Sequence, residues 1–132
     1  MNIKEICEAV IRLYLYADNT KMIHYSTSGS HYHKLCDDIR DCILKFADEF
    51  AEQSFGYYGK PNYSDFKLNL PIKQTEDLGE LCDNVLGLLK YYRKEMSKES
   101  KMLGVVSLID DFSGEIGKLK FLTTFDRVVN KR

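Results

Sequence analysis

The chain has no tryptophan, only 2 prolines and no run of apolar residues long enough to cross a bilayer. A membrane-spanning helix needs about 20 consecutive apolar residues, so the sequence argues against a membrane protein. The scarcity of proline leaves long stretches able to form uninterrupted helices. The N-terminus shows no signal-peptide pattern, and we therefore expect a cytoplasmic protein.

A strong net charge is also missing. The 19 basic side chains are offset by 20 acidic ones, which leaves a formal net charge of −1. Neither end of the chain carries a basic arm. Because affinity for nucleic acid depends mainly on Lys and Arg at phosphates, the sequence argues against nucleic-acid binding.

The cysteines lack the close pairing of a structural zinc site. Such sites usually place two cysteines about two to four residues apart, whereas the closest pair here is Cys36 and Cys42. These two, together with Cys7 and Cys82, fall inside helical patterns. In a cytoplasmic protein we expect all four to be small buried hydrophobes, not disulfide partners.

Apolar residues spaced three and four apart run through most of the chain, which is the pattern of amphipathic helices. It predicts helices over residues 2–25, from the turn at 26–30 to about Ser54, from Thr75 to the polar stretch at 97–101, and over 101–129. No useful strand alternation is present. The sequence therefore predicts an all-α protein in which residues 1–132 form one four-helix bundle domain.

Several details of these helices can be predicted. Ser28 or Ser30 would cap the second helix, with Gly29 as a permissive turn residue, and Thr75 would cap the third. The inward stripe of the fourth helix is predicted to contain Val105, Ile109, Phe112, Ile116, Leu119, Leu122, Phe125 and Val129.

The segment 55–74 breaks the helical pattern with two glycines, two prolines and several aromatic residues. It is unusually long for a bundle loop. An extended chain of this length can span the whole second helix, so we expect one long crossover between the second and third helices, as in ferritin-like bundles. The alternative is a loop that packs its aromatic residues over one end of the bundle.

The second predicted helix carries two pairs of metal-ligand residues, His33 with Asp37 and Asp48 with Glu52. Each pair is spaced four residues apart and so shares a helix face. Both pairs are centred on the same point, between Cys42 and Ile43. If two copies of the helix pack antiparallel about that point, the first pair of one copy faces the second pair of the other, which creates two identical sites.

One chain alone cannot form such a site, because about 16 Å of helix separates Asp37 from Asp48. We therefore expect a two-fold dimer in which Ala47 and Ala51 let the two backbones approach closely. His24 closes the apolar stripe of the first helix and is a further candidate ligand, although it could also be a hydrogen-bonded core histidine. Imidazole and carboxylate donors without thiolate suit Fe²⁺, Mn²⁺ or Zn²⁺.

These residues resemble a known family. The stretch from His24 to Gly59 looks like the ferroxidase segment of the Dps-type mini-ferritins, the DNA-protection-during-starvation group of the ferritin-like superfamily. The corresponding residues are His24-Tyr25, His33 with Asp37, and the sequence DEFAE at 48–52. The likeness is closer still to a ferritin-like domain of unknown function found in phages and bacteria, which has the same spacing between the two histidines.

The resemblance implies a dinuclear iron centre at a two-fold interface, with His24, His33 and Asp37 from one chain and Asp48 and Glu52 from the other. It also implies oxidation of Fe²⁺ by peroxide or oxygen, iron storage in a twelve-subunit (dodecameric) shell, and a bacterial or phage-encoded protein. Three features depart from the Dps pattern: a shorter spacer between the histidines, Tyr25 in place of the usual tryptophan, and no basic tail.

Two other functions fit the same residues. Taken separately, each pair of candidate ligands is what an ordinary solvated helix face shows. The chain could be a non-enzymatic helical oligomer or virion-associated protein with a structural or vestigial metal site, for example for zinc. It could also be a DNA-compacting protein without metal chemistry, against which the charge balance argues.

Overall fold

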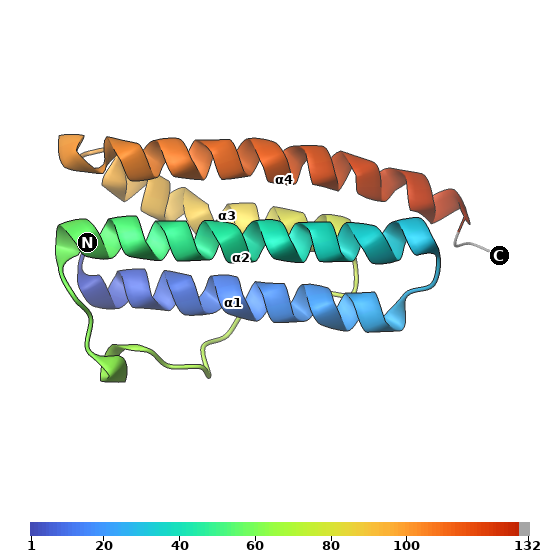
Figure 1. The fold of residues 1–132 in the computed structure, drawn as a ribbon, viewed down its shortest axis with the longest axis horizontal. Coiled ribbons are helices and arrows are strands. Elements are labelled where there is room, and N and C mark those ends of the chain that lie inside the picture. The colour runs from blue at the N-terminus through green and yellow to red at the C-terminus, as the bar shows by residue number, and fades with distance from the viewer. Residues whose placement is uncertain (130–132) are drawn as a thin grey trace.

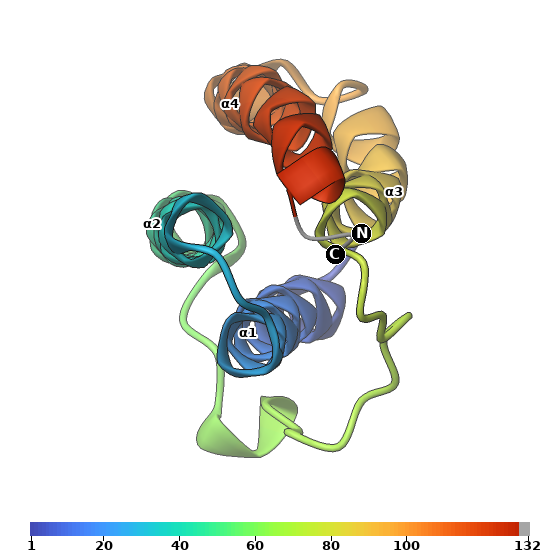
Figure 2. The same ribbon diagram turned by 90° about the vertical axis from the view of Figure 1, so that its right-hand side faces the viewer.

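A computed structural model describes the backbone of residues 1–129 and the side chains of residues 1–125. All regular structure in this part is helical, and no helix in it has both the length and the apolar character needed to cross a membrane. The predicted all-α fold with four long helices is confirmed. The helices are α1 (Ile3–Ser26), α2 (Ser30–Tyr58), α3 (Leu78–Met96) and α4 (Leu103–Val129), with short 3₁₀ turns η1 (Tyr63–Asp65) and η2 (Ser100–Met102) (Figures 1 and 2).

The helices α1 and α4 run in one direction along the bundle, and α2 and α3 run in the other (Figure 1). The segment between α2 and α3 travels back along α1, so that α3 starts toward the end of the bundle where α2 starts. The predicted crossover is therefore present. One of its aromatic residues, Phe66, packs on the end of the bundle, where its ring meets Phe55 in the last turn of α2 edge to face with centroids 6.2 Å apart.

The crossover is held against α1 by hydrogen bonds to its backbone. The buried Asn19 amide donates to the carbonyl of Thr75 (2.9 Å) and accepts from its N–H (3.1 Å). The Tyr16 hydroxyl accepts from the N–H of Lys73 (3.1 Å). Because a backbone segment without helical or sheet partners must bond elsewhere, these contacts fix the path of the link.

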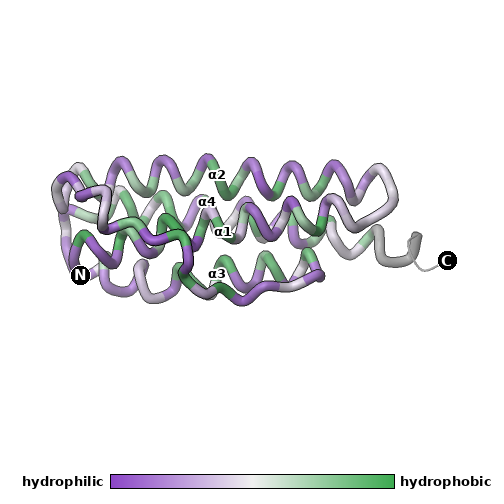
Figure 3. The backbone as a smooth tube through the Cα atoms, turned by 90° about the horizontal axis from the view of Figure 1, so that it is seen from below, coloured by the Kyte–Doolittle hydropathy of each residue, from purple (hydrophilic) through white to green (hydrophobic). Residues whose placement is uncertain are grey.

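The apolar stripe of α2 is buried as its spacing predicts: Cys36, Ile39, Ile43, Phe46 and Phe50 are all 3% exposed or less. Phe46 also stacks on Phe112 of α4, with ring centroids 4.2 Å apart. Hydrophobic and hydrophilic residues alternate along the α2 trace (Figure 3). Burial of one stripe leaves the opposite face of α2, with its carboxylates, outside the core.

Two of the predicted helix caps are wrong. Helix α2 is preceded by Gly29, which has φ +96° and no side-chain capping bond, so neither serine caps it. Helix α3 is capped by Asp77, whose carboxylate accepts from the N–H of Glu80 (2.9 Å). Thr75 cannot start that helix, because its backbone N–H and C=O are already bonded to Asn19.

The inward stripe of α4 is correct only over its first half. Val105, Ile109, Phe112 and Ile116 are buried, whereas Leu122 is 36% and Phe125 is 54% exposed. The buried face of α4 instead continues through Thr123, which is 4% exposed and lies close to Gly79 of α3, so Leu122 and Phe125 on either side of it point away from the neighbouring helix. The side chain of Val129 lies outside the described residues.

Candidate metal centre

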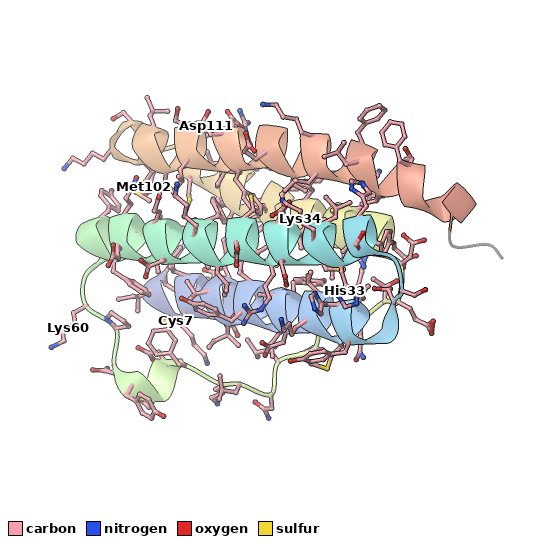
Figure 4. The ribbon with its side chains drawn as sticks, turned by 45° about the vertical axis from the view of Figure 1, so that its right-hand side comes forward. Cys7, His33, Lys34, Lys60, Met102 and Asp111 are labelled. Carbon is pink, nitrogen blue, oxygen red and sulfur yellow. The ribbon has the colours of Figure 1, made fainter. Side chains whose placement is uncertain are left out.

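The last turns of α1 and the first turns of α2 meet beside the short connection between them. This end of the α1–α2 hairpin carries His24 on α1, and His33 and Asp37 on α2. Figure 4 shows His33 at this end, between the two helices. A three-residue connection (27–29) is responsible, because it folds α2 directly back along α1.

The two histidine rings lie against each other, with centroids 4.1 Å apart and planes inclined by 46°. Nε2 of His33 lies 2.9 Å from the carbonyl oxygen of Thr27. A carbonyl can only accept, so Nε2 donates this hydrogen bond, and Nδ1 is the ring nitrogen that remains to bind a metal. This arrangement is typical of a metal-binding histidine, which usually donates its second ring nitrogen to a carbonyl or carboxylate.

His24 provides another ring nitrogen that could bind a metal. Its Nδ1 is buried and lies 3.1 Å from Oδ1 of Asp37, yet this nitrogen forms no hydrogen bond. Buried polar atoms are nearly always bonded. An unbonded imidazole nitrogen beside a carboxylate therefore fits a cation held between them.

His24 closes the apolar stripe of α1 as its spacing predicts, and its role as a metal ligand stays a prediction. Its position continues the buried stripe of α1, in which Ala17 and Thr20 are fully covered, yet its ring reaches His33 and Asp37 at the edge of the hairpin. It can do so because it lies in the last turn of α1, next to the connection to α2.

Asp48 and Glu52 lie well away from the histidines in the same chain. Both are exposed, and neither forms an ion pair or hydrogen bond with the part of the chain that the structure describes. They lie near Tyr14 of α1, whose pKa is raised by burial and by these two carboxylates. The structure thus brings together three of the five predicted ligands and leaves two apart, as the helix rise requires for one chain.

The prediction for the two alanines is wrong. Ala47 is 0% and Ala51 is 9% exposed, and both belong to the core of their own chain. Their position on the helix wheel, beside the stripe of His33, turns them inward once α1 packs there. They do not line a surface for a second copy.

Lys21 is a member of the cluster that sequence reasoning missed. Its Nζ lies 3.6 Å from Oδ1 of Asp37 and 5.3 Å from the ring centre of Tyr25. Its spacing of three residues from His24 on the same helix could have indicated it. As placed, no group of three His, Cys, Asp or Glu side chains among the described residues converges to hold a metal ion.

A separate groove of about 230 Å³ lies between α2 and α4, lined in part by Cys42, Phe46, Glu49 and Glu115. These residues of α2 lie on the side of the helix away from His33. Burial, and then the charge of Glu115, raise the pKa of Cys42 to about 11. The groove has no part in the histidine cluster.

Comparison of the chain with protein-family models, with curated proteins and with solved structures finds no match. Its function is therefore inferred from its own residues.

Proposed function

We propose that this protein is a ferritin-like, Dps-type iron protein that binds two Fe²⁺ ions at a site shared by two copies of the chain and oxidises them. One copy would supply His24, His33 and Asp37, and the other Asp48 and Glu52. The observation that carries the proposal is the gathering of the first three at one end of the hairpin, with a buried, unbonded Nδ1 on His24.

The symmetry of α2 supports a shared site. Both ligand pairs are centred between Cys42 and Ile43, so an antiparallel twin of α2 would place exposed carboxylates opposite the histidine cluster, twice. Such a self-complementary contact is the usual form of a two-fold dimer. The bundle, with its single crossover between the second and third helices, is also the topology of ferritin-like proteins.

The donor set suits the chemistry. Imidazole and carboxylate ligands accept Fe²⁺ well, and the carboxylates favour the Fe³⁺ that forms. With hydrogen peroxide as oxidant, each of two Fe²⁺ ions gives up one electron, and the peroxide takes up two protons and becomes two water molecules. With dioxygen the same two electrons and two protons yield one hydrogen peroxide. By resemblance, the proposal extends to iron storage in a twelve-subunit shell.

Anaerobic titration with Fe²⁺ followed by peroxide tests the proposal. We expect an Fe³⁺ absorption band that saturates at two ions per site in the wild-type chain. In the double variant Asp48→Ala, Glu52→Ala the band should disappear while the helical circular dichroism stays unchanged, because both side chains are exposed. Equal bands in the two proteins would end the ferroxidase proposal. Native mass spectrometry of the same samples would show a dimer or a larger shell.

A second function is favoured by two contacts. The bond from His33 to the Thr27 carbonyl and the contact of Lys21 with Asp37 tie α1 to α2 without any metal. A cluster of this kind also suits a non-enzymatic helical oligomer or virion-associated protein whose metal site is structural. Metal analysis of the purified protein distinguishes the two: a tightly bound, redox-inert metal such as zinc, with no Fe³⁺ band, would favour the structural function.

A further inference from the structure

We propose that Lys21 is a built-in competitor of the metal ion: its ammonium group pairs with Asp37 in the metal-free chain and must leave that carboxylate when a metal binds. The inference rests on the proposed metal site and names a residue that sets its affinity.

Two side chains contact the same carboxylate oxygen of Asp37. Oδ1 of Asp37 lies 3.6 Å from Nζ of Lys21 and 3.1 Å from Nδ1 of His24. A metal ion bound by that oxygen and that nitrogen would lie about 2 Å from each, which places it within a few ångströms of the ammonium group. Two positive charges at such a distance repel each other, and solvent screens part of that repulsion because the Lys21 and Asp37 side chains are 30% and 49% exposed.

The Lys21 ammonium group has a second possible partner, the ring of Tyr25. The group already lies 5.3 Å from the ring centre of Tyr25, one helical turn further along α1, and the Tyr25 side chain is 69% exposed. The face of an aromatic ring attracts a cation even at an exposed position. A change of side-chain rotamer can therefore move the charge off Asp37 toward the ring and solvent, without moving the helix.

The neighbouring helix offers a matched control. Lys34 and Asp38 form a similar ion pair on α2, with Nζ and Oδ2 3.0 Å apart, and both side chains face solvent on the outside of the hairpin. Removal of the Lys34 charge changes the net charge of the chain by the same amount. The same substitution does not change the contacts that Oδ1 of Asp37 makes with Lys21 and His24.

The experiment is a calorimetric titration with Co²⁺, a divalent probe with no redox step, of the full chain and of Lys21→Met, Lys21→Arg and Lys34→Met. Partly exposed ion pairs are weak, so we expect Lys21→Met to bind Co²⁺ roughly two- to fivefold more tightly than wild type. Lys21→Arg, which keeps the positive charge, should bind no more tightly than wild type. Lys34→Met should match wild type. Circular dichroism confirms that each variant is folded.

The outcomes separate this inference from the proposed site. If wild type binds Co²⁺ but Lys21→Met binds with the same affinity, or Lys34→Met gains as much, Lys21 is not a competitor and the metal site stands. If wild type binds no more Co²⁺ than the Asp48→Ala, Glu52→Ala variant, the shared site itself is absent, and the inference falls with it.

Discussion

The imidazole rings of His24 and His33 face each other across the turn between α1 and α2, with their centroids 4.1 Å apart. The two residues come from different helices, and nothing but the short connection at 27–29 separates those helices in the chain. The geometry of this turn therefore determines whether the two histidines meet.

Loss of the His24 ring should remove a ligand without disturbing the fold. We expect His24→Ala to weaken Co²⁺ binding by at least about tenfold, because it deletes the unbonded buried nitrogen beside Asp37. His31→Ala is the control, since His31 is exposed in the first turn of α2. Equal losses in the two variants would place Co²⁺ outside the cluster.

A site shared between two chains can be restored by combining two variant chains, each of which lacks a different part of the ligand set. In a mixed dimer of His24→Ala with Asp48→Ala, Glu52→Ala, one of the two sites receives all its ligands from intact residues. Tandem affinity purification of the mixed dimer should therefore recover about half of the wild-type Co²⁺ stoichiometry.

The control for this complementation is a mixed dimer of His24→Ala with His33→Ala. Each of its sites lacks one histidine, so it should bind no better than either parent. Recovery in both mixed dimers, or in neither, would contradict a site divided between histidines of one chain and carboxylates of the other.

The connection at 27–29 depends on a glycine. Gly29 has φ +96°, where a side chain is strained, so Gly29→Ala should destabilise the protein by about 1–2 kcal/mol in urea unfolding. Gly114→Ala is a useful comparison, because Gly114 is exposed within α4 and an added Cβ meets nothing within 4 Å. It should stabilise by about 0.5–1 kcal/mol. A neutral Gly29→Ala would mean that the turn adopts another conformation.

The pair of bonds between Asn19 and Thr75 should matter more for stability than an ordinary surface bond. Asn19→Ala leaves the N–H and C=O of Thr75 without partners near a side chain that is 6% exposed, and should cost about 2 kcal/mol. Asn84→Ala removes one exposed bond to the Lys73 carbonyl and should cost under about 1 kcal/mol. Urea midpoints of the two variants provide the test, and the reverse order would show that the crossover is not held at Asn19.

Burial of Cys82 predicts a loss of stability in alkali. The residue is 0% exposed, and burial, followed by the charge of Asp83, raises the pKa of its thiol to about 12, well above the usual value for a cysteine. A raised pKa means that the folded chain keeps the proton while the unfolded chain releases it. The stabilisation is complete below about pH 9 and is lost as the pH rises toward the folded pKa, by about 1 kcal/mol per pH unit. Urea unfolding at increasing pH measures this loss, which should be smaller in Cys82→Val.

Local rules were sufficient for the helices. The spacing of apolar residues predicted all four, and the buried stripe of α2 from Cys36 to Phe50 is correct throughout. Local rules were insufficient where a contact with another part of the fold determines the structure. Thr75 has the chemistry of a cap, but Asn19 already holds its backbone. Leu122 and Phe125 continue the apolar period of α4, but the side chain that meets α3 at this level is Thr123, close to Gly79.

The candidate site divides in the same way. The sequence alone shows the residue types, the four-residue spacings and the symmetric placement of the two ligand pairs along α2. The spacings predict a shared helix face because that depends only on the period of a helix. Other features of the site depend on how α1 packs against α2. These are the contact of His24 with His33, the bond from His33 Nε2 to Thr27 and the burial of Ala47. The pairing of Lys21 with Asp37 joins residues on two helices, so only the folded chain could reveal that a positive charge already lies beside the carboxylate.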